Sequence, residues 1–309
     1  MNDALAPLVV IAGPTGSGKS DLAIALAETF QGEIVNCDSL QLYRYLNIGT
    51  AKTPDVDRHG IPHHLFDIVN PDEFFTAGDY SRLSRATVKD ITARGKLPIV
   101  VGGTGFYLRA LLDGLFPGPV RDAGLRERLA QRPASLHKLL HRFDAAAASR
   151  IHENDTQKLI RALEVCLLAR KPITSLHAQG TERLTGFRIL KLGLDPPRAA
   201  LVERLNHRCV KMFEAGLLEE VRQVMALGYP ASSKAFESIG YREAILYIDG
   251  VFTMEEAIAA TQIATRQYAK RQRTWFRREP GMLWLEEFGN LDKTAEMAIG
   301  LVQNFLNIS

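Results

Sequence analysis

Cysteine and long apolar runs are both scarce in this chain of 309 residues. The three cysteines, Cys37, Cys166 and Cys209, are odd in number and far apart, which excludes a disulfide framework and a CxxC zinc site. No window approaches the roughly 18 consecutive apolar residues of a membrane span, and the opening Met-Asn-Asp lacks the basic start of a secretory signal. We therefore expect reduced thiols, no membrane segment and a cytoplasmic location.

The net charge is only +3, but it is unevenly distributed along the chain. Residues 114–186 contain 12 lysines and arginines against 7 acidic residues, which gives this segment a charge of +5 and leaves −2 for the remainder. Residues 266–278 carry six cations and no acid. A charge run usually marks a solvated face, but six cations without an acid favour a nucleic-acid partner over that interpretation.

Short apolar segments alternate with helical patterns over much of the chain. The alternation indicates a parallel sheet with its functional site at the carboxyl ends of the strands. Strands are expected at Leu8–Ala12, Glu33–Asn36, Pro98–Val101, Phe187–Leu194 and Met282–Leu285.

The middle of the chain differs, because residues 115–185 show no convincing strand. Helical patterns such as Asp155–Arg170 occur there instead, with Leu159, Leu163 and Leu167 in one apolar row. We interpret residues 115–186 as a helical insertion, and residues 1–114 with 187–309 as the core. The remaining helices are expected at residues 20–30, 197–227, 241–247, 253–278 and 291–306.

A glycine-rich octapeptide near the N-terminus fits the phosphate-binding pattern GxxxxGK[ST]. It reads Gly13-Pro14-Thr15-Gly16-Ser17-Gly18-Lys19-Ser20. Because it follows an expected strand and opens a helix, its backbone N–H groups and the helix dipole would face one anion. Lys19 would hold the terminal phosphate, and Ser20 would ligate Mg²⁺. The alternative interpretation of the octapeptide as an ordinary glycine-rich turn is disfavoured. The predicted fold is α/β, a P-loop NTPase-like parallel sheet flanked by helices, with an inserted all-helical domain.

Asp38 follows the second expected strand, so we expect it beside the glycine loop at the same sheet edge. Its carboxylate could hold magnesium, accept a proton from a nucleophile, or cap the next helix. Ser39 and Gln41 offer donors and acceptors suited to the edge of a purine. The third expected strand ends in Gly102-Gly103-Thr104-Gly105 rather than in an acid. Because an acid at this place usually positions the metal and the water, its absence disfavours simple NTP hydrolysis. The turn is suited either to close approach of a ligand to the backbone or to a plain connection between strand and helix.

Six blocks of sequence, in order along nearly the whole chain, resemble the bacterial tRNA dimethylallyltransferases, the IPP transferase family. The blocks are GPTGSGKS, DSLQLYR followed by IGTAK, GGTGFY (Gly102–Tyr107), LIRALEV (Leu159–Val165), ESIGYRE (Glu237–Glu243) and KRQRTWFR (Lys270–Arg277).

The resemblance implies transfer of a dimethylallyl group from dimethylallyl diphosphate to N6 of the adenosine at tRNA position 37, beside the anticodon. In that chemistry the glycine loop and Mg²⁺ stabilise the leaving pyrophosphate. Asp38 is the natural general base because the attacking amine loses a proton. Thr15 and Thr104 are further catalytic candidates, and Arg204 and Arg208, four residues apart, could assist the leaving group or lie on the surface.

The resemblance also implies where tRNA is held, and the basic segments agree with it. Arg266, Lys270, Arg273 and Arg277 would form one basic stripe on a helix, with Tyr268 and Trp275 packing on the body from the opposite side. The implied tRNA-binding positions are Asp38, Ser39, Leu40, Gln41, Thr104, Arg126, Gln157, Lys158, Leu159, Ile160, Arg161, Glu237, Ser238, Ile239, Gly240, Tyr241, Arg242, Lys270, Arg271, Gln272, Arg273, Thr274, Trp275, Phe276 and Arg277.

Three other functions stay open from the residues. An adenylate isopentenyltransferase would not need the basic segments, a P-loop nucleoside or metabolite kinase would use Asp38 on a hydroxyl, and a non-catalytic RNA-binding protein would have no use for Asp38. His63 and His64 lack a spaced third ligand, so we expect residues 61–65 to form a loop near the core. Cys37 is interpreted as a small buried residue. No apolar surface helix marks a dimer seam, so a monomer is expected.

Overall fold

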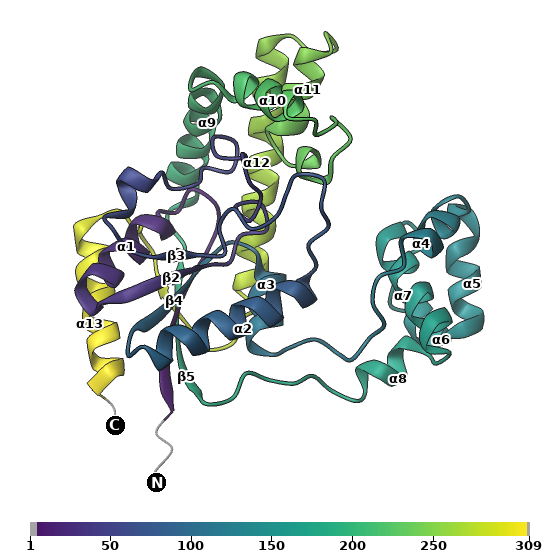
Figure 1. Ribbon diagram of the computed structural model, residues 1–309, viewed down its shortest axis with the longest axis horizontal. Coiled ribbons are helices and arrows are strands. Elements are labelled where there is room, and N and C mark those ends of the chain that lie inside the picture. The colour runs from purple at the N-terminus through teal and green to yellow at the C-terminus, as the bar shows by residue number, and fades with distance from the viewer. Residues whose placement is uncertain (1–4, 308–309) are drawn as a thin grey trace. The chain divides into compact units, whose positions relative to one another are not determined.

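The computed structural model describes residues 5–307, so the Met1–Asp3 segment considered above lies outside it. The chain forms two compact units (Figure 1). The core unit runs up to Leu111 and resumes at Thr185, and the second unit spans Leu112–Leu184. The sequence prediction set the limits of its insertion at residues 115 and 186. Each unit is described by itself below.

The core unit is built on one six-stranded sheet in the order β3-β2-β4-β1-β5-β6, and every pairing is parallel. The predicted parallel α/β fold is confirmed. Strand β1, in the interior of the sheet, is covered on both faces, as expected for parallel sheets. Its residues Leu8 to Ala12 are all buried. The strands are β1 (Ala6–Ala12), β2 (Gly32–Asn36), β3 (His63–His64), β4 (Leu97–Gly102), β5 (Phe187–Leu194) and β6 (Met282–Leu285).

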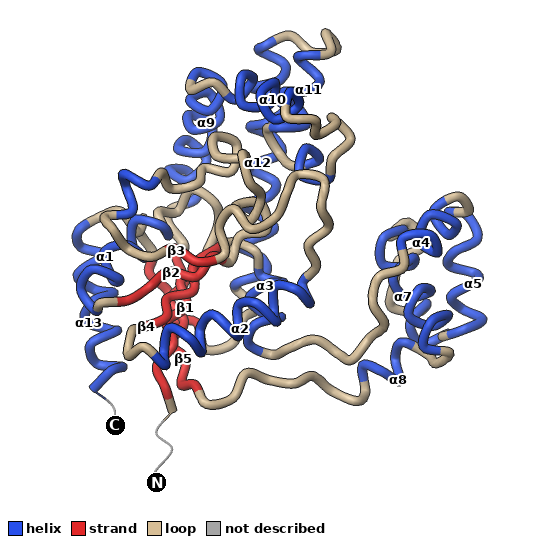
Figure 2. The backbone as a smooth tube through the Cα atoms, in the orientation of Figure 1, coloured by secondary structure: helices blue, strands red, loops and turns tan. Residues whose placement is uncertain are grey.

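Helices flank this sheet and extend beyond its carboxyl edge (Figure 2). One sheet face packs against α1 and α13, whose apolar residues share a single core with the strands. The helices of the core unit are α1 (Lys19–Phe30), α2 (Ala77–Ala93), α3 (Gly105–Leu112, ending at the unit boundary), α9 (Arg198–Glu214), α10 (Leu217–Ala226), α11 (Tyr241–Ile248), α12 (Met254–Phe276) and α13 (Asp292–Asn307).

Two sequence predictions for the core unit are wrong. Residues 61–65 do not form only a loop, because His63 and His64 make the short edge strand β3, paired with Ile34 and Val35 of β2. The expected helix over residues 197–227 is two helices, α9 and α10. Gly216 separates them with φ of 98°, a left-handed conformation that only glycine adopts at little cost.

The second unit is a small helical bundle around its own apolar core. Its helices are α4 (Ala123–Ala130), α5 (Leu136–Phe143), α6 (Ala145–Ala148), α7 (Thr156–Ala169) and α8 (Ile173–His177). Glu164 of α7 is fully buried in this core, where its carboxylate accepts hydrogen bonds from Arg126, from Arg161 and from the backbone N–H of Asp122. A buried carboxylate needs such partners, since an isolated one would be too costly to keep ionised. Within residues 5–307, no helix is long and apolar enough to cross a membrane.

Candidate active site

The glycine loop lies between β1 and α1 and turns tightly around the start of the helix. Gly13, Gly16 and Gly18 all have positive φ, at 150°, 78° and 84°. A Cβ on Gly13 would lie 2.6 Å from the carbonyl oxygen of Leu194, so the backbone itself must pass close to the end of β5. The loop therefore presents successive backbone N–H groups at the N-terminus of α1, where a helix favours negative charge.

Lys19 is the first residue of α1, and its side chain folds back under the loop. Its ammonium group donates a hydrogen bond to the carbonyl oxygen of Pro14 over 2.7 Å. Burial lowers the pKa of Lys19 to about 8; Asp38 opposes this shift and Arg208 adds to it. The ammonium group of Lys19 is thus held away from water. A bound anion would favour its protonated form and raise its pKa again.

Two arginines of α9 reach the same loop. The Arg208 guanidinium donates to the Thr15 hydroxyl over 2.7 Å, and its Nε is buried with no hydrogen-bond partner in the described chain. Arg204 donates to the Asn290 side chain over 2.7 Å, and its guanidinium lies over the ring of Phe288 at 4.7 Å. The structure therefore brings both candidate arginines to the glycine loop, with one N–H of Arg208 still unused.

Asp38 follows β2 in a turn that is fixed from both sides. One carboxylate oxygen of Asp38 accepts a hydrogen bond from the backbone N–H of Leu40 over 2.9 Å. The backbone N–H of Asp38 donates to the side-chain oxygen of Asn36 over 2.9 Å. The next residue, Ser39, donates its backbone N–H to the Thr104 hydroxyl over 3.0 Å. Thr104, from the glycine turn after β4, thus contacts the Asp38–Ser39 turn itself.

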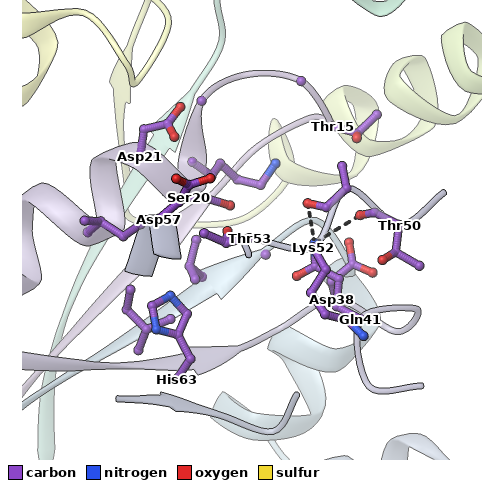
Figure 3. Close-up of a pocket in the computed structure, with 18 of the residues that line it drawn as sticks. Thr15, Ser20, Asp21, Asp38, Gln41, Thr50, Lys52, Thr53, Asp57 and His63 are labelled. Carbon is purple, nitrogen blue, oxygen red and sulfur yellow. Dashed lines mark hydrogen bonds between the residues drawn. The ribbon is translucent and has the colours of Figure 1, made fainter. Parts of the chain in front are cut away.

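These groups line one cavity of about 710 Å³ at the carboxyl edge of the sheet (Figure 3). Gln41 reaches across part of its wall, where its amide nitrogen donates to the carbonyl oxygens of Thr50 and Ala51 at 3.1 and 3.3 Å. The polar residues around the cavity are Thr15, Lys19, Ser20, Asp21, Glu28, Asp38, Gln41, Thr50, Lys52, Thr53, Asp57, His59, His63, Arg204, Arg208 and Gln272. Cations from α1 and α9 therefore line the same cavity as the carboxylate of Asp38, which follows β2.

Cys37 lies beside this cavity but is not a nucleophile. The thiol is buried, and burial raises its pKa to about 12, so it stays protonated. All three cysteines are free and buried. The interpretation of Cys37 as a small buried residue is confirmed.

Helix α12 packs on the body through its predicted aromatic residues and through a fully buried row beside them. Its buried row is Thr261, Thr265, Ala269, Gln272 and Phe276. Tyr268 and Trp275, which we expected on the packed side, are partly buried: the Trp275 ring lies directly against Gly105, and Arg109 lies over that ring at 4.6 Å. The predicted packing of these two aromatic residues on the body is therefore present, and the fully buried row beside them, which includes small and amide side chains, makes the closest approach to the glycine turns.

The basic stripe of α12 is also partly neutralised from elsewhere in the chain. Arg273 and Arg277 both pair with Asp195, which follows β5 and lies about 80 residues away in sequence. Arg266 donates to the Asn206 side chain over 2.6 Å. Lys270 and Arg271 are exposed, and neither pairs with Asp195.

Several other residues implied to contact tRNA have structural roles. Tyr241 is fully buried, donates to Glu220 over 2.5 Å and accepts from the backbone N–H of Gly49. Glu220 also accepts from the N–H groups of Asn47 and Ile48, so α10 and α11 hold the loop before Lys52. Burial prevents direct side-chain contact with tRNA at these positions: Leu159, Ile160, Tyr241, Gln272 and Phe276.

In the second unit, the implied tRNA-binding residues divide into two kinds. Gln157 and Lys158 are exposed at the start of α7. Arg126 and Arg161 instead pair with the buried Glu164, at 2.9 and 2.7 Å. Both nitrogens through which the Arg126 guanidinium donates, Nε and one terminal nitrogen, bond to that carboxylate.

A parallel sheet whose first strand runs through a GxxxxGK[ST] loop into a helix, with cations and carboxylates around the loop, defines a P-loop-like fold. Residues 41–279 match the sequence profile of the IPP transferase family. The chain belongs to this family. It is accordingly an enzyme of the transferase class, and the resemblance deduced from the six blocks is confirmed.

Relatives of known name cover almost the whole chain. The tRNA dimethylallyltransferase of Solibacter usitatus is 58% identical over 304 residues, which are 97% of this chain and 99% of that protein. The one from Koribacter versatilis is 57% identical, over 94% of this chain and 95% of that protein.

Solved structures agree with the sequence relatives. A tRNA isopentenylpyrophosphate transferase from Bacillus halodurans has a TM-score of 0.73 at 34% identity, covering 97% of this chain and 96% of that one. A eukaryotic dimethylallyltransferase acting on tRNA has a TM-score of 0.84 at 29% identity, covering 97% of this chain and 79% of that one.

Proposed function

We propose that this enzyme transfers the dimethylallyl group of dimethylallyl diphosphate to N6 of the adenosine at tRNA position 37. The observation that carries the proposal is that one cavity brings together two cations suited to a departing diphosphate, Lys19 and Arg208, and a carboxylate suited to an attacking amine, Asp38. The names of the relatives, which are tRNA dimethylallyltransferases, supply the two substrates.

The reaction divides between the two sides of this cavity. The bond between the allylic carbon and the diphosphate oxygen breaks, and pyrophosphate leaves with the electron pair. The adenosine N6 forms the new bond to that carbon and gives one proton to Asp38, whose second carboxylate oxygen is not used by Leu40. The products are N6-(dimethylallyl)adenosine and pyrophosphate, and no water takes part.

The glycine loop stabilises the charge that develops on the leaving group. Lys19, the unused N–H of Arg208 and the amides at the start of α1 are fixed before the reaction, so they need not reorganise when the bond breaks. Thr15 is held by Arg208, and Thr104 orients the Asp38 turn. We assign Thr15 and Thr104 to positioning the two reacting sides.

The donor set around the loop fits Mg²⁺. Within residues 5–307 no group of three His, Cys, Asp or Glu residues gathers as a metal centre. This agrees with Mg²⁺ at phosphate sites, which takes one or two protein oxygens and completes its shell with phosphate and water. Ser20 would supply the hydroxyl ligand, and the ion would neutralise charge on the diphosphate.

The adenine must leave its stack to reach Asp38, and phosphate contacts elsewhere have to offset that cost of a few kcal/mol. The turn formed by Ser39, Leu40 and Gln41 is the place we assign to the extruded base. Lys270 and Arg271 on α12, and Gln157 and Lys158 on α7, are exposed positions for the tRNA backbone.

The second unit also offers a basic groove for the anticodon stem. It lies between α4 and α5, and its charged lining consists of Arg128, Arg132, Lys138 and Arg142. All four of these cations are exposed. This groove therefore offers exposed cations to a phosphate backbone, whereas Arg126 and Arg161 are paired with the buried Glu164.

Incubation with labelled dimethylallyl diphosphate and unmodified tRNA tests the function directly. We expect label to enter tRNA and pyrophosphate to be released in equal amounts, with the label on the adenosine beside the anticodon. Phosphate transfer from ATP to a nucleoside would establish a kinase instead, and prenylation of free AMP but not tRNA would establish an adenylate isopentenyltransferase.

Neutralising the α4–α5 groove should weaken tRNA binding in a salt-dependent way. Each phosphate contact contributes about 0.7 to 0.9 to the slope of log affinity against log salt, so changing all four cations to Gln should flatten the slope by about 3. The matched control changes four exposed cations of the core unit, Arg82, Lys89, Arg222 and Lys293, in the same way. If the groove variant and the control variant have equal salt slopes, the groove is not part of the tRNA-binding surface.

A further inference from the structure

Gln272 of α12 joins two loops of the active site through a single side-chain amide. Its Oε1 accepts from the backbone N–H of Thr15 over 2.8 Å, and its Nε2 donates to the carbonyl oxygen of Gly103 over 2.8 Å. The residue is only 4% exposed. Both ends of the amide are therefore satisfied inside the protein, and the side chain is not available to tRNA.

The fit around this amide is tight on the Gly103 side. A Cβ added to Gly103 would lie 2.2 Å from Nε2 of Gln272, and one added to Gly105 would lie 2.1 Å from the Trp275 ring. The two glycines thus allow α12 to approach the turn directly. This explains why the Gly102–Gly105 segment needs glycine in a protein that does not activate water there.

Each loop that Gln272 holds controls one side of the reaction. Thr15 contacts Arg208, which faces the diphosphate position. Gly103 precedes Thr104, whose hydroxyl accepts from Ser39 beside Asp38. One amide consequently sets the spacing between the leaving-group side and the base side of the cavity.

Tyr268, one turn before Gln272, lies on the same side of α12. Burial, together with the nearby Asp38, raises the pKa of Tyr268, while hydrogen bonding to Thr104 and Gln272 opposes the rise. The phenol is therefore neutral and lies close to the same two polar groups. Lys270 and Arg271, which we assign to tRNA, lie between Tyr268 and Gln272 in sequence.

We propose that Gln272 is a positioning residue that holds the diphosphate loop and the Asp38 turn in register, so that the reactive geometry depends on the placement of α12. The inference rests on the proposed prenyl transfer. It gives the KRQRTWFR block two roles on one helix: its exposed cations face tRNA, and its buried amide holds the catalytic loops.

Gln272→Glu keeps the shape of the side chain but, when the carboxylate is ionised, removes only one of the two hydrogen bonds. An ionised carboxylate can accept from Thr15 but cannot donate to Gly103, whereas a protonated carboxyl can do both. We expect single-turnover transfer at saturating tRNA to fall about 100-fold at pH 8, the size of loss that a misplacement of about 1 Å causes. The ratio of variant to wild-type rate should then rise at least about tenfold as the pH is lowered to 6, because burial favours the protonated carboxyl.

Taking the ratio to wild type at each pH removes the titration of the groups common to both proteins, which around this amide are Asp38, Lys19, Arg208 and Tyr268. Gln267→Glu is the matched control, since Gln267 is exposed on the same helix. It should keep wild-type rates and show a flat ratio. A flat ratio for Gln272→Glu would overturn the proposal, as would a loss of tRNA affinity with an unchanged rate at saturation.

Gln272→Met gives a readout that does not depend on turnover. It removes both hydrogen bonds at similar length, and we expect pyrophosphate to bind about tenfold more weakly by calorimetry, because Thr15 and its contact with Arg208 lose their anchor. Unchanged pyrophosphate affinity in a folded Gln272→Met protein would contradict the positioning role. If wild type itself transfers no label to tRNA, the proposed function fails, and the calorimetric result still decides whether Gln272 holds the loop.

Discussion

Asp38→Asn lowers the rate of prenyl transfer by about 10² to 10⁴-fold, the range that a general base contributes, while tRNA and pyrophosphate still bind. The amide keeps the size of the side chain and can still accept from Leu40, so the turn that Thr104 fixes stays in place. What it loses is the ability to take a proton from the adenosine amine. The measurement is single-turnover transfer of label at saturating tRNA, with binding followed separately.

A second carboxylate in the same cavity provides the control for Asp38. Asp21 lies in the first turn of α1 and also lines the cavity, so Asp21→Asn removes the same charge from the same space. It should leave the rate within a few-fold of wild type. Comparable losses for the two variants would mean that the cavity needs negative charge in general rather than a base at Asp38.

Lys19→Met should lower the transfer rate by about 10² to 10³-fold, the usual effect of removing one fixed group that stabilises developing charge. Unlike Asp38→Asn, it should also weaken pyrophosphate binding. The cation is buried without a carboxylate partner of its own, so the anion is its main source of stabilisation. Lys89→Met, at an exposed position of α2 in the core unit, is a suitable control because it removes a cation from outside the cavity.

The same lysine predicts how anion affinity depends on pH. In the free enzyme the pKa of Lys19 is lowered to about 8, and a bound diphosphate favours the protonated form. Pyrophosphate affinity relative to Lys19→Met should therefore be constant below pH 8 and fall by up to about tenfold per pH unit above it, with proton uptake on binding. Calorimetry between pH 7 and 9.5 measures both quantities. A constant ratio of the two affinities over that range would contradict a pKa of about 8 for Lys19 in the free enzyme.

Local patterns were sufficient to predict the catalytic edge of the sheet. The GxxxxGK[ST] spacing requires a strand, a tight turn and a helix in succession, and these follow one another as β1, the glycine loop and α1. Asp38 was predicted beside the loop because parallel strands end on one edge, and it lines the same cavity as Lys19. Both predictions depend on residues within a few positions of a strand end, where sequence determines geometry most directly.

Features that depend on distant partners could not be predicted in this way. The charge run on α12 has no acid within it, so nothing nearby indicates that Asp195 pairs with Arg273 and Arg277. The buried row of α12 contains Gln272, which composition alone assigns to a surface. The two-residue strand β3 is too short for any periodic pattern, and it forms only because β2 offers a free edge.

The base of the second unit is closed by a backbone hydrogen bond of 2.8 Å, in which the N–H of Leu184 donates to the carbonyl oxygen of Leu112. The points where the chain enters and leaves the bundle are thus neighbours, so a few residues could join them, and closing so short a loop costs little entropy. The bundle carries its own apolar core and its own buried charge network. The bundle is therefore a separable unit, and exchanging it between relatives would replace the basic groove between α4 and α5 without changing the residues of the cavity in the core unit.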